Sequence, residues 1–509
     1  MKILFIFPNA NSQTGFQYGI AHLSAVLKQA GHSVELIQLC EDIAPLPAKE
    51  SFQTMIKQAD PDVIGFSIVT NQWAYARKTA AWAREITEVP IVCGGIHALA
   101  AGEDILKSGV FDYIIRGEAE DAFLDFVNTL ENKEDVSDLQ NLGMIENNTI
   151  KINPMRPLPD LKQLPFKDYA VFDFQKIIDA KNGWVGLMSS RGCPFSCTYC
   201  FNHYVVKQYR KDLNCSFKQL NYIRRFDVAD MIDEIQFLIK HYQNIKMFIF
   251  DDDIFTFYKD HVIEFCSAYK KICSLPFTVN GHVGVFDEEM AAHLADANCR
   301  IVKFGVESGS PRIRKMILNR HMKNENIVNA IQIAKKAGLH TSVFLMIGLP
   351  DETRENVYET IEIMARSLPG RFRWTFFFPY PGTKALEISK ELTGIDHEKM
   401  EKMENFTDDT CLKFDDDHIL FLKKVGRVMP WFVNAASDLE CAGIYREKVD
   451  KILKMTSGEW EKESDTLLEM DKELSKKLVS RNQTHYAIKY NRFMGVSSDY
   501  FIQEELENN

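Results

Sequence analysis

Long apolar runs and basic residues are both scarce in this sequence, and each shortage argues against a class of protein. No apolar run reaches about 18 residues, the length that predicts a membrane-spanning helix. The opening apolar stretch ends at Pro8 with no small-residue cleavage site after it, which favours a β-strand over a secretory signal. Lys and Arg number 60 against 71 Asp and Glu, for a net charge of −11. Such an acidic chain argues against bulk binding to nucleic acid or anionic membranes, although a local basic patch is compatible with it.

The sequence also lacks the even, closely spaced cysteines of a secreted disulfide framework. Its 11 cysteines are odd in number and scattered through a long chain, so we expect a reducing, cytoplasmic compartment. Five of them lie in apolar segments, where cysteine usually serves as a small core residue: Cys40, Cys93, Cys266, Cys273 and Cys299. Three others, Cys193, Cys197 and Cys200, stand together in the stretch RGCPFSCTYCFNH.

The order of apolar segments predicts an α/β protein with several domains, since 509 residues exceed a single core. Over residues 1–140, short β-branched runs alternate with amphipathic stretches, which indicates a Rossmann-like parallel sheet. A cluster of prolines then predicts an extended linker over 141–183. The alternation resumes over 184–385 as about six βα units, the pattern of a partial (β/α)6 barrel of the TIM type. We expect residues 386–509 to form a helical region that supplies a lid and part of a substrate pocket.

The three clustered cysteines directly follow the first predicted barrel strand, on a loop where such barrels carry their active sites. Together with His203 they have the ligand types of a four-coordinate structural zinc site. An iron–sulfur cluster also takes thiolates, but electron-transfer clusters use four, and no fourth cysteine lies close by. Three cysteines on a cubane leave one iron with an open position, which suits a catalyst. Spacing alone favours the cluster and leaves zinc as an alternative.

The spacing Cys-x3-Cys-x2-Cys, with Tyr199 before the last cysteine, resembles the signature of the radical S-adenosylmethionine (SAM) enzymes. In that family three cysteines hold a [4Fe–4S] cluster and SAM chelates the open iron. Electron transfer into the sulfonium then releases methionine and a 5′-deoxyadenosyl radical. The resemblance implies that Cys193, Cys197 and Cys200 hold such a cluster, and that a flavodoxin- or ferredoxin-type partner supplies the electron.

Other segments resemble the same family in the expected order. FGVESGS (304–310) resembles a fourth-strand motif whose glutamate contacts SAM, and LMIGLPDET (345–353) resembles a strand end that lies against the adenosyl group. The resemblance implies SAM contacts for these residues: Tyr199, Glu307, Ser308, Arg320 and Gly348. Asp252 lies in FDDDIFT, which resembles the second-strand end, and His282 stands where relatives often carry an arginine. We expect these two residues to contact substrate or to handle protons.

The N-terminal domain resembles the cobalamin-binding domain that precedes this barrel in one class of radical SAM methyltransferases. The resemblance lies in PDVIGFSIVTNQW, VPIVCGGIHA and FDYIIRGEAED. It implies cobalamin contacts at strand ends and glycines: Ser67, Val69, Thr70, Asn71, Gln72, Gly94, Gly95, Gly117 and Glu118. The Asp-x-His-x-x-Gly motif that supplies an axial histidine elsewhere is absent, so we do not expect His22 or His97 to bind cobalt.

The combined resemblance implies an enzyme that methylates an unactivated carbon, or a phosphinate, of a small-molecule biosynthetic intermediate. A cobalamin-dependent radical SAM cyclase or rearrangement enzyme without net methyl transfer would carry the same motifs. A non-catalytic zinc- or cobalamin-binding sensor is a more distant hypothesis. The sequence does not separate these outcomes, because the motifs belong to the cofactors and not to the substrate.

Overall fold

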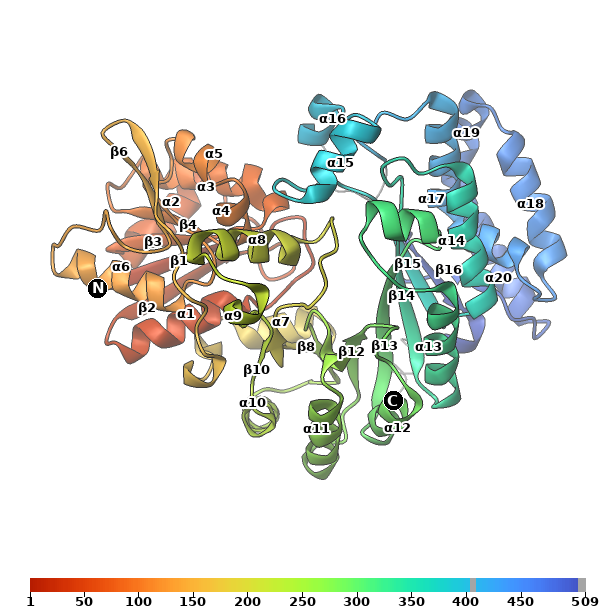
Figure 1. The fold of residues 1–509 in the computed structure, drawn as a ribbon, viewed down its shortest axis with the longest axis horizontal. Coiled ribbons are helices and arrows are strands. Elements are labelled where there is room, and N and C mark those ends of the chain that lie inside the picture. The colour runs from red at the N-terminus through yellow and green to blue at the C-terminus, as the bar shows by residue number, and fades with distance from the viewer. Residues whose placement is uncertain (403–408, 502–509) are drawn as a thin grey trace. The chain divides into compact units, whose positions relative to one another are not determined.

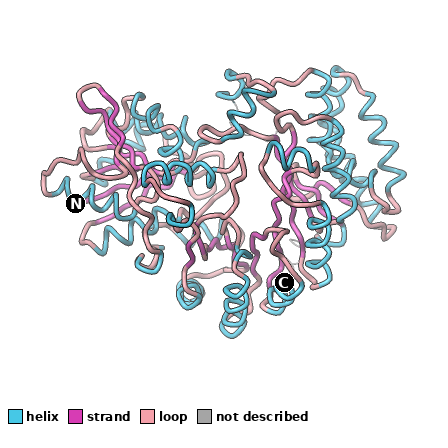
Figure 2. Tube along the Cα trace, viewed as in Figure 1, coloured by secondary structure: helices cyan, strands magenta, loops and turns pink. Residues whose placement is uncertain are grey.

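The computed structural model describes residues 1–402 and 409–501. The chain forms two compact units. The first contains Met1–Pro194 and Cys200–Asp253, and the second contains Phe195–Tyr199 and Ile254–Asn509. Figure 2 shows that both units are built from helices and strands. In the described part of the chain, no helix combines the length and the hydropathy that a membrane span requires.

The first unit opens with a seven-stranded sheet in the order β2-β1-β3-β4-β5-β6-β7 (Figure 1). Its strands are β1 (Lys2–Pro8), β2 (Ser33–Leu39), β3 (Val63–Ser67), β4 (Ile91–Gly94), β5 (Tyr113–Ile115), β6 (Leu142–Glu146) and β7 (Thr149–Ile152). The first five are parallel, and β1 is buried along most of its length, as expected for a strand covered on both faces. The predicted Rossmann-like domain is confirmed.

The parallel strands are joined by helices that cover the sheet. These are α1 (Tyr18–Gln29), α2 (Lys49–Ala59), η1 (Thr70–Gln72), α3 (Trp73–Arg84), α4 (Ile96–Ala100), α5 (Gly102–Lys107) and α6 (Glu120–Glu131). α1 packs beside α6, and α2 packs beside α3. α2 and α3 close over apolar side chains of the sheet, which gives this domain its own core.

Residues 141–152, which the sequence analysis placed in the linker, instead extend this sheet. β6 and β7 form an antiparallel hairpin on β5. Their turn residues Asn147 and Asn148 have φ of 48° and 59°, the backbone of a type I′ turn, which asparagine tolerates. The proline-containing segment follows β7 and carries η2 (Leu161–Gln163), η3 (Tyr169–Val171) and α7 (Phe174–Ala180).

The first unit also contains the first two parallel strands of the barrel region. β8 (Trp184–Leu187) pairs in parallel with β11 (Met247–Phe250). The short strands β9 (Ser190–Arg191) and β10 (Arg224–Arg225) pair antiparallel. The helices between β8 and β11 are α8 (Phe201–Leu213), α9 (Phe217–Leu220) and α10 (Val228–His241). α10 buries Met231, Ile235 and Leu238, whose spacing of three to four residues places them on one helix face.

The second unit continues the βα alternation with a parallel sheet in the order β12-β13-β14-β15. Its elements are η4 (Phe255–Phe257), α11 (Lys259–Ile272), β12 (Phe277–Gly281), α12 (Glu288–Asp296), β13 (Cys299–Glu307), the π-helix η5 (Ile313–Ile317), α13 (Asn324–Lys336), β14 (His340–Ile347), α14 (Arg354–Ser367) and β15 (Arg371–Phe376). With β8 and β11, these strands make the six predicted βα units.

The C-terminal region is mostly helical, as predicted, but it also adds two strands to the second unit. Its elements are α15 (Lys384–Leu392), α16 (His397–Lys402), α17 (Asp416–Ala436), α18 (Ala442–Lys454), α19 (Ser457–Glu463), η6 (Ser464–Thr466), α20 (Leu467–Val479), β16 (Tyr486–Ile488), β17 (Met494–Ser497) and η7 (Ser498–Tyr500). β17 pairs antiparallel with both β15 and β16. The region therefore continues the sheet as well as covering it.

A kink in α17 joins this region to the barrel strands. Pro430 has no backbone N–H to donate to the carbonyl of Gly426, and Val428 between them has a non-helical φ of −138°. The indole Nε1 of Trp374, on β15, donates to that carbonyl at 2.8 Å. The buried polar atom freed by the proline is thus satisfied by a strand side chain, which sets α17 against β15.

A buried ion pair ties the proline-containing segment to α10 in the first unit. Lys167 Nζ lies 2.6 Å from Glu234 Oε1, with side chains only 5% and 8% exposed. The hydroxyl of Tyr169 donates to the same carboxylate. A nearby pair, Lys28 and Asp168, has the same 2.6 Å separation, but its lysine is 41% exposed.

Removing the lysine should lower the free energy of unfolding by different amounts in these two pairs. Lys167→Ala leaves a buried carboxylate without its cation, so we expect it to lower the free energy of unfolding by about 3–5 kcal/mol. Lys28→Ala removes an exposed lysine and leaves Asp168 with the Ser24 hydroxyl as a donor, so it should cost less than about 1 kcal/mol. Urea unfolding monitored by circular dichroism measures both. Equal, small losses would contradict the assignment of Lys167 as a structural partner.

Candidate active site

The N-terminal sheet places the predicted cobalamin residues at one edge. In the strand order 2-1-3-4-5 the connections reverse direction between β1 and β3, and ligands bind beyond the carboxyl ends of strands at such a point. Ser67 ends β3 and lies opposite Gly94, which ends β4. Gln17 Nε2 donates to Ser67 Oγ at 3.2 Å. Gln72 Nε2 donates to the carbonyl of Ala10, beyond the end of β1, at 2.8 Å. The predicted residues Ser67, Val69, Thr70, Asn71 and Gln72 thus follow β3 beside the switch point, and Gly94 and Gly95 follow the neighbouring strand β4.

Gly95 allows the loops after β3 and β4 to approach closely. Its φ is +89°, and a Cβ at this position would lie 2.6 Å from the carbonyl oxygen of Ile68. Next to it, His97 Nδ1 lies 3.3 Å from Thr70 Oγ1, and its ring packs against Trp73. Burial lowers the pKa of His97 to about 4, so the imidazole is neutral at pH 7.

Gly117 and Glu118 have structural contacts that the sequence did not reveal. A Cβ on Gly117 would lie 2.2 Å from Tyr209 Oη, and the same hydroxyl accepts the Glu118 N–H at 2.8 Å. The Glu118 carboxylate accepts from Arg191 Nη1 at 2.7 Å and also pairs with Arg224. Their charges lower its pKa against the opposing effect of burial. Glu118 thus connects the cobalamin-type domain to β9, which ends two residues before Cys193.

The cysteine loop begins with a glycine that no other residue can replace without strain. Gly192 has a φ of +93°, and a Cβ there would lie 2.4 Å from the carbonyl oxygen of Tyr222. Cys200 occupies the N-cap position of α8. Asn202 Nδ2 lies 3.7 Å from Cys200 Sγ and donates to Asp253 Oδ1 at 2.8 Å. A hydrogen bond to a ligand sulfur is one of the means by which proteins tune iron–sulfur clusters.

The part of the loop that belongs to the second unit is held by other groups. Thr198 Oγ1 donates to the carbonyl of Ile317 at 2.6 Å. Arg320 Nη1 lies 3.4 Å from Cys197 Sγ and 3.5 Å from Tyr199 Oη. The Nε of Arg320 is buried and has no hydrogen-bond acceptor among the described residues. A guanidinium whose buried N–H has no acceptor fits an anionic ligand such as the carboxylate of SAM.

Glu307 lies beside this arginine at the end of β13, in a strained conformation. Its φ is +67°, which is rare for a residue other than glycine, and the strand register shifts at this point. Burial raises the pKa of Glu307, and the Arg320 charge opposes that shift. A Cβ on Gly305 would lie 2.5 Å from Glu307 Oε1, so that glycine makes room for the carboxylate. By contrast, the Ser308 hydroxyl accepts from the Ser310 N–H at 3.2 Å and lies within the loop.

The end of β14 contains a buried acid that the sequence analysis overlooked. Glu352 Oε2 accepts the N–H of Gly348 at 2.6 Å and that of Leu349 at 3.2 Å. Its other oxygen is buried without a donor among the described residues. Burial raises the pKa of Glu352 to about 8. The signal was present in GLPDE, where an acid four residues after a glycine can fold back on the glycine's N–H.

The two residues predicted to handle protons have different surroundings. The Asp252 carboxylate accepts from the Ser189 N–H at 3.0 Å and the Ser189 hydroxyl at 2.6 Å, and burial raises its pKa to about 6. These contacts fix the chain just after β8. The His282 ring stacks on Phe195, within the cysteine loop, at a centroid distance of 4.1 Å. His282 Nδ1 accepts the N–H of Gly284, so the ring proton sits on Nε2. Burial lowers its pKa to about 4, which makes His282 a neutral donor at pH 7.

In the residues that the structure describes, no three His, Cys, Asp or Glu side chains converge as ligands of a single metal ion. A cubane cluster does not require such convergence, because each thiolate binds a different iron.

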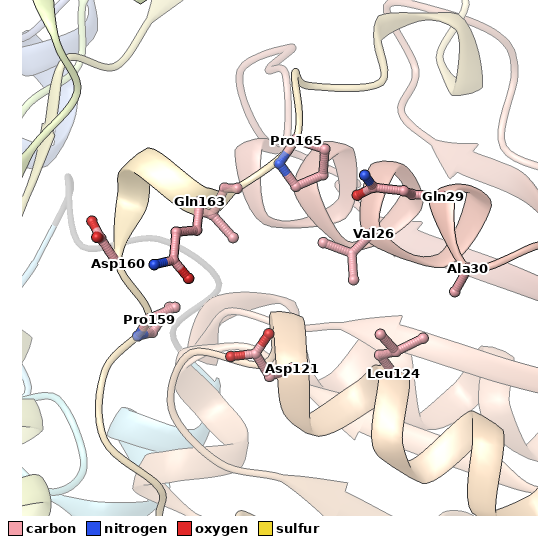
Figure 3. Close-up of a pocket in the computed structure, with 10 residues that line it drawn as sticks. Val26, Gln29, Ala30, Asp121, Leu124, Pro159, Asp160, Gln163 and Pro165 are labelled. Carbon is pink, nitrogen blue, oxygen red and sulfur yellow. The ribbon is translucent and has the colours of Figure 1, made fainter.

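A cavity of about 350 Å³ in the first unit lies between α1, α6 and the proline-containing segment (Figure 3). None of the predicted site residues lines it.

Comparisons with known proteins agree with this arrangement. The Radical SAM superfamily model matches residues 187–364, and the B12 binding domain model matches residues 12–127. An uncharacterized methyltransferase, PH0819, of Pyrococcus horikoshii is 30% identical over 402 residues, which cover 76% of this chain and 83% of the relative. The anaerobic magnesium-protoporphyrin IX monomethyl ester cyclase of Rubrivivax gelatinosus is 25% identical over 420 residues, covering 78% of this chain and 72% of that one.

A solved structure shares the fold. The radical SAM methyltransferase TsrM from Kitasatospora setae, solved with cobalamin and a [4Fe–4S] cluster bound, superposes with a TM-score of 0.62 at 16% identity. The match covers 77% of this chain and 75% of that one. Fold and site thus define a cobalamin-dependent radical enzyme. The chain belongs to the radical SAM superfamily, among the members that carry a B12 binding domain, and its cofactors are a [4Fe–4S] cluster, SAM and cobalamin.

The close approach at Gly95 predicts the effect of adding a methyl group there. Gly95→Ala adds a 2.6 Å clash to an unfavourable φ, so we expect lower stability and at least a several-fold loss of bound cobalamin. Gly109→Ala is the matched control, because its φ is +72° but nothing lies within 4 Å of the added Cβ. Cobalamin retained after desalting, read by visible absorption, measures binding. Equal retention by both variants would contradict a special role for Gly95.

The raised pKa of Glu352 predicts a pH dependence of stability. Between its ordinary value and about 8, the folded protein binds a proton that the unfolded chain has released. The free energy of unfolding should therefore fall as the pH rises through this window, by up to about 1.4 kcal/mol per pH unit from this group. Glu352→Gln, which resembles the protonated acid, should flatten the slope. Asp351→Asn, at the exposed neighbouring position, should leave it unchanged, and identical slopes for wild type and Glu352→Gln would refute the assignment.

Proposed function

We propose that this enzyme methylates an unactivated carbon, or a phosphinate, of a small-molecule biosynthetic intermediate. Cys193, Cys197 and Cys200 hold the cluster in this proposal. The observation that carries it is the half-buried Arg320, which reaches Cys197 Sγ at 3.4 Å and whose buried Nε–H has no acceptor among the described residues. A cation in that position, beside the acid Glu307, is complementary to the carboxylate and ammonium groups of SAM. Methyl transfer as the outcome is supported by the relative that is named a methyltransferase.

The residues around this pair do the work of placement. When bound, the cluster and SAM supply a radical that removes a hydrogen atom from the substrate, and cobalamin supplies a methyl carrier. Arg320 orients the SAM carboxylate, and Gly305 leaves room for the Glu307 side chain. Gly348, with a φ of +71°, turns the chain at the end of β14, and Glu352 fixes its N–H. His282 offers a neutral N–H, so it donates a hydrogen bond and does not accept a proton near pH 7.

An oxidative cyclase or rearrangement enzyme is the second candidate function. The cyclase from Rubrivivax gelatinosus supports it, because that relative aligns with 78% of this chain. A non-catalytic sensor is set aside, since the family to which this chain belongs is one of enzymes.

The mass and isotope content of the product separate the two candidates. Cultures with and without the gene are fed methionine labelled in its methyl group, and their small molecules are compared. Methyl transfer predicts a labelled product that disappears on deletion and is heavier by one CH₂ than the compound that accumulates. A product that carries no label and has lost hydrogen relative to that compound would establish the cyclase reading instead.

The cluster assignment predicts the iron content of cysteine variants. Cys193→Ser, Cys197→Ser and Cys200→Ser should each retain well under half of the wild-type iron after anaerobic reconstitution, because serine replaces one of only three thiolates. Cys215→Ser is the control, since Cys215 lies beyond α8 and outside the motif. Colorimetric iron analysis and the sulfur-to-iron absorption band give two readouts. The assignment would be overturned if the three motif variants kept their iron and only Cys215→Ser lost it.

A further inference from the structure

The helix that follows the cysteine loop carries an exposed basic surface on an acidic protein. Residues 201–225 contain six Lys or Arg and one Asp, whereas the whole chain has a net charge of −11. Five of the cations are exposed and define the surface called the α8 basic face: Lys207, Arg210, Lys211, Lys218 and Arg225. The remaining arginine, Arg224, is buried against Glu118, and the aspartate pairs with Arg116.

The orientation of α8 is set by its opposite side. Tyr204, Val205 and Tyr209 pack in an apolar cluster with Leu99 and Met155 of the same unit. Lys207, Arg210 and Lys211 consequently lie on the face of α8 turned away from that cluster. Among the described residues, Lys207, Lys211 and Lys218 form no ion pair with any carboxylate.

Local structure explains only part of this charge. Arg210 and Lys211 occupy the last turn of α8, where cations complement the negative end of a helix. Lys207 lies a full turn earlier and Arg225 is on β10, whereas Lys218 is in the last turn of the short helix α9. Two of the five cations, Lys207 and Arg225, therefore have no such explanation.

The basic face frames the cysteine loop on both sides. Cys200 caps α8, so Lys207 stands seven residues along the same helix, about 10 Å at 1.5 Å per residue. On the other side, Arg225 pairs across the β-ladder with Ser190, three residues before Cys193. Positive charge thus accumulates beside the one loop that must receive electrons.

We propose that the α8 basic face is the docking surface for an acidic electron-carrier protein that reduces the cluster. The inference rests on the proposed function, because only a cluster that cleaves SAM needs repeated reduction. In each encounter the reduced carrier loses one electron and the oxidised cluster gains it, with no transfer of atoms. An acidic chain would otherwise repel an acidic carrier, so a local patch of opposite sign is required for productive encounter.

The test compares a protein reductant with a small chemical one on the same reconstituted full-length enzyme. Release of 5′-deoxyadenosine is measured with reduced flavodoxin and, separately, with dithionite, which needs no docking surface. The variant is Lys207→Glu/Lys211→Glu. Its control is Lys472→Glu/Lys476→Glu, an equal charge change at the same spacing on the exposed face of α20. Bleaching of the cluster by flavodoxin in a stopped-flow instrument gives a readout that does not depend on turnover.

We expect the α8 variant to slow flavodoxin-driven bleaching and 5′-deoxyadenosine release at least tenfold at low salt, while dithionite-driven release stays at the wild-type level. The wild-type rate with flavodoxin should also fall steeply as salt screens the face, and the variant's rate should change little. The α20 control should behave as wild type with both reductants.

Unchanged rates in the α8 variant, or equal losses in the α8 variant and the α20 control, would overturn the docking surface. If the α8 variant also loses dithionite activity, the pair Lys218→Glu/Arg225→Glu decides the question by the same criterion. Wild-type enzyme that releases no 5′-deoxyadenosine with either reductant would overturn the proposed function, and the docking surface with it.

Discussion

The stretch Arg191–Asn202 carries the three cysteines that we propose as cluster ligands, and it must be held in shape by its surroundings, because a free loop would spend most of its time in other conformations. In this chain the constraint is met at three points along the loop. Arg191, just before it, is held by Glu118 and Glu120. Thr198, in its middle, is held by the carbonyl of Ile317. Asn202, just after it, is held by Asp253. Each anchor comes from a segment outside the loop, so the loop depends on the folding of the rest of each unit.

Buried charge is the main cost of this arrangement. Glu118 with Arg191, Lys167 with Glu234, and Arg320 near Glu307 all remove ions from water, and each is tolerated only because a partner lies within hydrogen-bond reach or close by. Backbone strain adds to the cost at the half-buried Glu307, which has a positive φ and lies beside Arg320. The apolar cores of the two units, which contain most of the large side chains, offset these terms. The buried charges and the strained backbone lower stability, but they hold side chains in the positions that the chemistry requires.

Local sequence signals were sufficient for the elements with strong periodicity and for residues near the cysteine motif. The first five strands and the six βα units follow from apolar runs whose length and spacing depend on neighbouring residues only. The hairpin of β6 and β7 was missed because a pair of asparagines between short strands is a weak signal next to four prolines. β16 and β17 were missed because β17 pairs with β15, which lies more than 100 residues earlier in the chain, and β16 is held only through β17. Glu352 was missed because its role depends on burial, which a motif does not display.

The sequence by itself determined the chemical type of this protein. The spacing of Cys193, Cys197 and Cys200, the strand-end segments and the order of the two α/β domains are properties of the chain's order, and they indicate the cofactors. Only the tertiary structure showed which partners and surroundings the ionisable side chains have. It showed that Glu118 serves an ion pair with Arg191, that His282 is a neutral donor, and that the cations of α8 gather on one exposed face. These properties depend on which groups from distant segments meet and on how much water remains around them, and neither is encoded in local sequence.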